Sequence, residues 1–134
     1  MADVLIQTGH QRSVVVHSMG LDEISCVGPT KILEINGKQK LQYIIDPLDF
    51  GLSRCKITDL QGGNANMNAR LLLDVFKGKG GPVADTLILN AAVALYIYGL
   101  CSSIAEAVSY ASNNLYSGAV LTLLNNWIEF SHEQ

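Results

Sequence analysis

Two long stretches without a charged residue occupy the C-terminal half of the chain. No residue is charged between Asp85 and Glu106, and the same holds between Glu106 and Glu129. A membrane-spanning helix needs about 20 mainly apolar residues, but both stretches contain several Asn, Ser or Gly residues that interrupt an apolar surface. The two stretches therefore predict helices of a soluble protein rather than membrane spans. These helices are expected to be buried in a core or to face a partner.

The composition limits the classes of protein that remain. A chain of 134 residues is long enough for one domain with a packed core. Its hydrophobic content of 49% argues against disorder, and its net charge of −3 without a basic cluster argues against a nucleic-acid partner. Cys26, Cys55 and Cys101 are too widely spaced for a C-x-x-C pair, which disfavours a disulfide framework and a cysteine zinc site. No basic start precedes an apolar leader, so the expected location is the cytoplasm.

The N-terminal half predicts a short helix, a strand and a hairpin. Residues 2–7 have a helical pattern, and residues 13–17 form a continuous run with three valines. Such a run is typical of a strand covered on both faces, as in a parallel sheet. Residues 30–35 and 40–45 are further strand-like runs, and the Asn36-Gly37 pair between them is a strong hairpin signal.

The C-terminal half predicts helices throughout. Their ranges are about 64–77, 84–98, 103–116 and 119–130. Asn64 or Asn66 suits the start of the first helix, and Ser103 with Glu106 has the spacing of a capping box. The predicted fold class is α/β, with a partial, mainly parallel sheet, a β-hairpin and a C-terminal layer of helices.

Asp22 and Glu23 are the most suggestive candidates for a site. They follow the predicted strand that ends at His17, and ligands of open α/β sheets bind beyond such strand ends. Two carboxylates suit a hard cation such as Mg²⁺, which usually also binds substrate phosphates. Without further evidence, however, an Asp-Glu pair in a polar loop is more often simply solvated. A single histidine at a strand end, such as His17, is more often structural than ligand-binding.

Other segments carry weaker signals for chemistry. Gly62-Gly63 lacks the pattern of a phosphate-binding loop, so a turn before a helix is the better interpretation. The glycine-rich break at residues 78–81 resembles a surface linker. The chain has no nucleophile elbow, and no cysteine has a base beside it in sequence.

Several short motifs together resemble the anthranilate phosphoribosyltransferase family. The segment His17-Ser18-Met19-Gly20-Leu21-Asp22-Glu23, with the later Gly28-Pro29-Thr30, resembles the family's signature loop. Further matches follow in order: Asp49-Phe50-Gly51-Leu52, Gly62-Gly63 with Asn68-Ala69, Gly78-Lys79-Gly80, Leu89-Asn90-Ala91-Ala92 and Ser117-Gly118-Ala119. The ordered set covers essentially all 134 residues, and Met67 is a departure, because the family usually has a glutamate there.

The resemblance implies a glycosyltransferase of tryptophan biosynthesis. The family moves a phosphoribosyl group from phosphoribosyl pyrophosphate to the amine of anthranilate and releases pyrophosphate with Mg²⁺. Asp22 and Glu23 match the Asp-Glu pair of the family's loop and are therefore expected to bind magnesium. The chemistry agrees, because a cation held by carboxylates can stabilise the negative charge on the departing pyrophosphate.

The resemblance also implies that part of the family enzyme has no counterpart in these residues. The G-T-G-G-D phosphate loop, the Lys-His-Gly-Asn segment and the N-terminal helical domain, with its anthranilate contacts and dimer interface, are not matched. Residues 1–134 thus resemble the C-terminal portion of the α/β domain.

Two main functions stay open. The chain acts as an enzyme only with an N-terminal partner, or it is a truncated, non-catalytic remnant that serves as a binding or interaction module. A glycine-rich phosphate loop encoded upstream of this chain would favour the first function. The alternative to an N-terminal partner is a second copy of this chain in a homo-oligomer. An unrelated metal-binding domain is a third interpretation.

Overall fold

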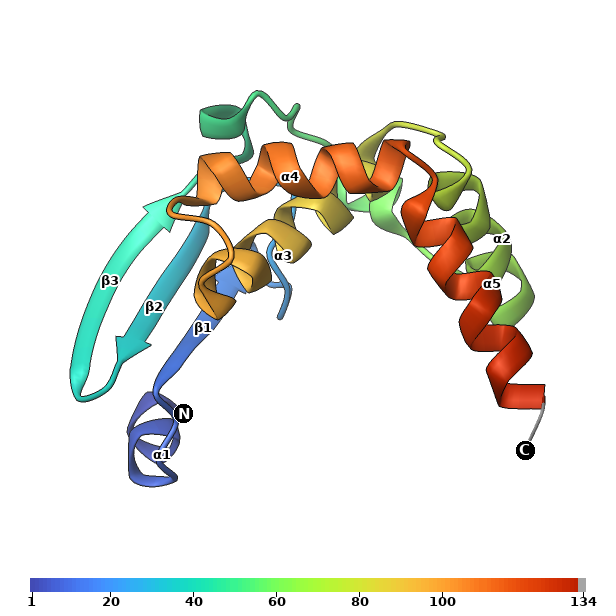
Figure 1. The fold of residues 1–134 in the computed structure, drawn as a ribbon. Coiled ribbons are helices and arrows are strands. Elements are labelled where there is room, and N and C mark those ends of the chain that lie inside the picture. Colours follow the sequence, from blue (N-terminus) through green and yellow to red (C-terminus); the bar gives the residue numbers. More distant parts are fainter. Residues whose placement is uncertain (133–134) are drawn as a thin grey trace.

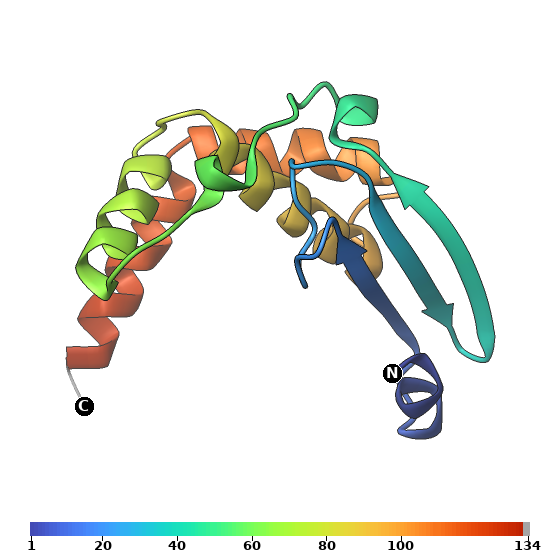
Figure 2. The same ribbon diagram turned by 180° about the vertical axis from the view of Figure 1, so that it is seen from behind.

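The computed structural model describes residues 1–132, which form an arch (Figures 1 and 2). A small sheet and a short helix make one side, two long helices make the crown, and another helix pair makes the other side. The elements in chain order are α1 (Ala2–Gln7), β1 (Arg12–Ser18), β2 (Thr30–Asn36), β3 (Gln39–Ile45), the 3-10 helices η1 (Pro47–Phe50) and η2 (Ile57–Leu60), α2 (Ala65–Phe76), α3 (Pro82–Tyr98), α4 (Ile104–Tyr116) and α5 (Ala119–His132).

The three-stranded sheet is antiparallel, so the prediction of a mainly parallel sheet is wrong for the described residues. β2 lies between β1 and β3, with Ser18 opposite Thr30 and Asn36 opposite Gln39. The reason is the connection between the first two strands. A parallel neighbour needs a crossover, usually through a helix, whereas the segment between β1 and β2 contains no helix. The broader prediction of a mixed α/β fold is confirmed.

The valine run of β1 predicted a strand correctly but not its surroundings. Val14, Val15 and Val16 are only half-buried, because β1 lies at one edge of the described sheet. Val14 and Val16 contact the core, so the strand has one well-covered face. A β-branched run therefore indicated extended backbone without deciding which strands would pair.

The hairpin between β2 and β3 is confirmed, with its turn one residue later than the Asn-Gly pair suggested. Asn36 and Gln39 face each other as the last strand pair, which leaves Gly37 and Lys38 as the two central turn residues. Gly37 has a φ of 59°, and Lys38 does not have a positive φ. This pattern is that of a type II′ turn, in which glycine is needed at the first central position.

Helix α3 is the centre of the core. Five of its residues are buried: Ala84, Ile88, Leu89, Ala92 and Val93. They pack with Ile32 of the sheet and with buried residues of α4. The first uncharged stretch therefore forms a helix with one buried face, as the sequence predicts in part, and its remaining residues are half-buried or exposed. No helix in residues 1–132 combines the length and apolar character that a membrane span requires.

Polar caps begin the helices near the predicted positions. The Asn64 side chain accepts a hydrogen bond from the backbone N–H of Met67 at 3.0 Å, which caps α2. At α4, Ser103 Oγ accepts from the Glu106 N–H at 3.1 Å. The Glu106 carboxylate reaches back to the N–H of Ser102 at 2.8 Å, one residue earlier than an ideal capping box.

A partly buried ion pair fixes the sheet to the C-terminal end of α3. Arg12 donates to Glu34 Oε1 from Nε at 3.3 Å and from Nη2 at 3.1 Å, and its Nη1 donates to the Tyr96 carbonyl at 3.0 Å. Tyr43 Oη donates to Glu34 Oε2 at 3.0 Å. Burial and the Glu34 contact raise the pKa of Tyr43 above its usual range. These partners compensate the charge of Glu34, which is only 7% exposed.

Helix α5 differs from α3 in that none of its described residues is buried. Leu123 and Trp127 are each 69% exposed, and Phe130 is 60% exposed. α5 and α2 form the side of the arch opposite the sheet (Figure 1). The second uncharged stretch thus ends in a helix whose apolar side chains face solvent in the structure.

Candidate functional site

The loop after β1 begins with a tight turn that the sequence shapes locally. Met19 and Gly20 both have positive φ, at 50° and 89°. The turn is closed by two backbone hydrogen bonds between Ser18 and Leu21, at 3.1 and 2.7 Å. Met19 is the only non-glycine residue with positive φ among the described residues. The side chain of Met19 lies over Gly28, where a Cβ would approach its Cγ to 3.2 Å.

The far end of the same loop is attached to α3. Asn90 Oδ1 accepts a hydrogen bond from the Ile24 N–H at 3.2 Å, and Asn90 Nδ2 donates to the Ile24 carbonyl at 2.6 Å. Two residues later, the N–H of Cys26 donates to Thr86 Oγ1 at 3.4 Å. Ile24 and Cys26 are themselves buried in the core. Part of this loop projects below α3 on the concave side of the arch (Figure 1).

Asp22 and Glu23 lie between these two attachment points, and both are exposed. Two adjacent carboxylates are oxygen donors of the type that Mg²⁺ prefers. No group of three or more His, Cys, Asp and Glu side chains in residues 1–132 could hold a metal ion. The donor set therefore fits Mg²⁺ only as a partial site, in which water or substrate phosphates supply the other ligands.

Neither His17 nor a cysteine side chain is hydrogen-bonded to the Asp22-Glu23 pair in the described residues. His17 is exposed on β1 opposite Lys31. Cys26 is fully buried, and burial raises the pKa of its thiol. A buried thiol with a raised pKa is a poor nucleophile, so the structural interpretation of both residue types is favoured.

The Gly62-Gly63 pair has a structural role before α2. Asn68 Oδ1 accepts from the Gly63 N–H at 2.7 Å, and Asn68 Nδ2 donates to the Gly63 carbonyl at 3.2 Å. A Cβ on Gly62 would lie 2.6 Å from Asn68 Oδ1, and one on Gly63 would lie 2.6 Å from the Met67 sulfur. A side chain at Gly62 or Gly63 would thus displace Asn68 or Met67, which explains two small residues in the segment that enters α2.

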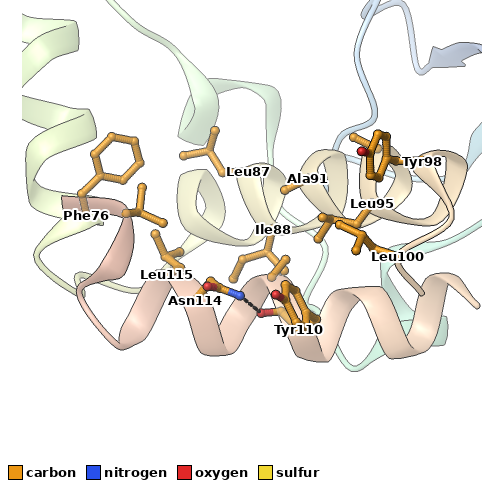
Figure 3. A pocket seen from close by; sticks show the side chains of 13 residues that line it. Phe76, Leu87, Ile88, Ala91, Leu95, Tyr98, Leu100, Tyr110, Asn114 and Leu115 are labelled. Atoms are coloured by element: carbon orange, nitrogen blue, oxygen red, sulfur yellow. Dashed lines mark hydrogen bonds between the residues drawn. The ribbon is translucent and has the colours of Figure 1, made fainter. Parts of the chain in front are cut away.

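An apolar groove of about 760 Å³ runs between α3 and α4 (Figure 3). Leu87, Ala91, Leu95 and Tyr98 of α3 form one wall at helical spacing. Residues of α4 form the facing wall, and Phe76 lies at the α2 end. The groove's few polar groups include Asn114, whose Nδ2 donates to the Tyr110 carbonyl at 3.0 Å. The groove is thus suited to apolar side chains rather than to a charged substrate.

Sequence reasoning did not find the groove or the Asn90 contacts. The uncharged stretch predicts a buried helix, but α3 is apolar nearly all round, so its sequence does not show which face stays open. The pair Thr86 and Asn90, four residues apart, was a usable signal, because that spacing places two polar side chains on one face of an otherwise apolar helix.

The comparison with known families agrees with this architecture. Residues 1–121 match the family model described as "Glycosyl transferase family, a/b domain". The chain therefore belongs to this family of glycosyl transferases.

Its relatives narrow the resemblance to the anthranilate phosphoribosyltransferases, as the motifs predict. The enzyme of that name from Rubrobacter xylanophilus is 43% identical over 133 residues, which are 98% of this chain and 39% of the relative. A crystal structure of the Thermus thermophilus enzyme has a TM-score of 0.88 at 33% identity, covering 96% of this chain and 38% of that one. A Mg-bound variant of the Saccharomyces cerevisiae enzyme has a TM-score of 0.79 at 26% identity, covering 88% of this chain and 35% of that one. The chain thus spans less than two fifths of the length of these relatives.

Proposed function

We propose that this chain contributes part of an anthranilate phosphoribosyltransferase and is inactive by itself. The observation that carries the proposal is the Asp22-Glu23 pair, exposed on a loop attached at both ends, in a chain whose relatives carry that enzyme name. The remaining groups for substrate binding belong to the portion of the relatives that this chain does not match. As in the family, the reaction belongs to tryptophan biosynthesis in the cytoplasm.

The proposed reaction makes one bond at the ribosyl carbon and breaks another. The amine nitrogen of anthranilate bonds to C1 of phosphoribosyl pyrophosphate, the bond from C1 to pyrophosphate breaks, and the amine loses a proton. Asp22 and Glu23 would hold Mg²⁺, which when bound offsets the negative charge of the leaving group. Residues 18–24 contribute by fixing the position of these two carboxylates between the Ser18–Leu21 turn and the Asn90–Ile24 contact.

The proposed occupant of the apolar groove is the rest of the phosphoribosyltransferase domain. The relatives contain more than half of their length beyond the matched region. The groove is lined almost entirely by apolar side chains, and Leu100 and Tyr98 are 59% and 81% exposed at its edge. A surface of this kind favours apolar segments of a protein partner, whether these lie on the same polypeptide or on a second chain.

The experiment that tests this function is complementation. The purified chain, with phosphoribosyl pyrophosphate, anthranilate and Mg²⁺, should give no product. Adding the part of the Rubrobacter xylanophilus enzyme that has no counterpart here should give a complex and restore turnover. The matched control is the Asp22→Asn, Glu23→Gln double variant, which should form the complex without comparable activity.

The remnant interpretation makes different predictions for the same samples. A complex without turnover would favour a non-catalytic interaction module, and the absence of a complex would reject the proposed occupant of the groove. A chain that pairs only with itself would identify a second copy as the occupant. Turnover by the isolated chain would show that the proposed division of the active site is wrong.

A further inference from the structure

We infer that Asn90 is a positioning residue that holds the Asp22-Glu23 pair in a geometry able to bind a divalent cation. This inference rests on the proposed function, because it assumes that these carboxylates bind Mg²⁺. It assigns a role to a side chain on α3 that touches neither the cation nor the substrate.

Asn90 binds both backbone polar groups of one loop residue. Its amide accepts from the N–H of Ile24 at 3.2 Å and donates to the carbonyl of Ile24 at 2.6 Å. The same Nδ2 also donates to the Thr86 carbonyl at 2.9 Å, which fixes the orientation of the amide on the helix. Only Asn and Gln carry a neutral amide donor and acceptor side by side, so an apolar or singly polar side chain cannot reproduce this contact.

The place of this contact gives it a role beyond folding. Ile24 directly follows Glu23, and the Ser18–Leu21 backbone pair closes the loop just before Asp22. The two carboxylates are therefore limited on both sides by hydrogen bonds to the backbone. A loop that is already ordered loses less conformational entropy when it binds a ligand, and contacts that orient metal ligands typically contribute about 10- to 100-fold in affinity.

Two different faces of α3 explain why a polar residue such as Asn90 stands in an apolar helix. Thr86 and Asn90 contact the loop, with Thr86 Oγ1 accepting from the Cys26 N–H at 3.4 Å. Leu87 and Ala91 turn toward the apolar groove (Figure 3). Neighbouring residues of α3 thus contact the Asp22-Glu23 loop on one face and the apolar groove on another.

The test measures metal binding separately from activity. Mn²⁺ is titrated into the ¹⁵N-labelled chain carrying Leu123→Lys, a change on exposed α5 that should reduce self-association and that is present in every sample compared. Line broadening of the Asp22 and Glu23 amides gives the dissociation constant, with Mg²⁺ as competitor. We expect Asn90→Ala to raise that constant by about tenfold. Val93→Ala removes a buried side chain from the same helix and is the control for lost stability. It should leave the constant within about twofold, because no described hydrogen bond joins it to the loop.

The outcomes separate this inference from the proposed function. If Asp22→Asn, Glu23→Gln binds Mn²⁺ as the wild type does, the metal loop is wrong and the inference fails with it. If that double variant loses binding while Asn90→Ala matches the wild type, the metal loop stands and Asn90 is only structural. Should Asn90→Ala not fold, Thr86→Val decides the question. A weaker Mn²⁺ affinity in that variant supports the inference, and an unchanged affinity overturns it.

Discussion

The two sides of the arch differ in how their side chains are covered. On the sheet side, the charge of Glu34 is compensated by Arg12, Tyr43 and the neighbouring Tyr96, and α3 covers one face. On the other side, α5 has no buried residue in the described part of the chain and exposes large apolar side chains. The charged and apolar side chains of the sheet side thus contact other residues of this chain, whereas the apolar side chains of α5 face solvent.

This comparison indicates which half of the molecule can hold its structure without help. Apolar surface in water costs about 25 cal/mol per Å², so an uncovered patch of a few hundred Å² costs several kcal/mol, which is comparable to the net stability of a domain. The sheet side also exposes Leu41 and Ile44, each at 62%, but its central strand β2 buries Ile32 and Ile35 completely, whereas α5 buries no residue. The α5 side therefore gains most from a partner.

The largest effect is expected from the apolar side chains of α5. The isolated chain should self-associate or aggregate at micromolar concentration and bind a hydrophobic dye. Leu123→Lys should weaken self-association by about tenfold, because a charge placed in an apolar contact must be desolvated. Sedimentation velocity measures the shift. Leu41→Lys on β3 is the matched control, since Leu41 is 62% exposed and Leu123 is 69% exposed.

Two different results would contradict the predicted self-association through α5. A monomeric wild type that binds no dye would show that the chain has closed its own core. Equal weakening by Leu41→Lys and Leu123→Lys would show that the two sides of the arch do not differ as partner surfaces.

A smaller effect is expected from the ion pair on the sheet side. Glu34→Gln should lower the free energy of unfolding by about 2 kcal/mol, because it removes the charge that Arg12 and two tyrosines contact. Urea denaturation measures the change. Asp74→Asn breaks the exposed Lys79–Asp74 pair near α2 and should cost less than about 0.5 kcal/mol. A cost for Asp74→Asn equal to that for Glu34→Gln would contradict the contrast.

Removing a helix cap is expected to affect the stability of the whole chain in the core helix α4, but only local stability in α2 on the α5 side of the arch. Ser103→Ala should lower global stability by about 1 kcal/mol, because α4 contributes buried residues to the core. Asn64→Ala should instead speed amide exchange mainly within α2, which has Val75 as its buried residue. Native-state hydrogen exchange reads both effects. Uniform acceleration across the chain by Asn64→Ala would show that α2 unfolds together with the core.

The smallest effect concerns Asp85 at the start of α3, the helix that joins the two sides. Burial raises the pKa of Asp85 above its unfolded value of 3.8. Well below that pH both states are protonated, so the group adds no pH-dependent cost. As the pH rises the unfolded state ionises first, so stability falls until the folded group ionises, and the loss then stays constant. Asp85→Asn should raise the melting temperature at pH 7 and leave it nearly unchanged below about pH 3.

The sequence by itself determined the elements and their order. Local signals, such as the cap at Asn64, the Ser103–Glu106 capping box and the Asn36-Gly37 pair, act over a few residues and predicted the helices and hairpin of the structure. The Asp-Glu pair was found as a candidate for the same reason, because its residue types and loop position are visible in the chain. Its proposed binding of magnesium stays a prediction.

Only the tertiary structure decided how these elements meet. The valines of β1 suit any sheet, so the antiparallel pairing with β2 followed from the absence of a crossover helix rather than from strand residues. The contact of Asn90 with Ile24 joins residues 66 positions apart. Hydrophobic burial is non-directional, so an apolar sequence shows that α3 and α5 both gain from being covered. Packing in three dimensions alone decides that one face of α3 is covered within this chain, while its groove-lining face and α5 are not.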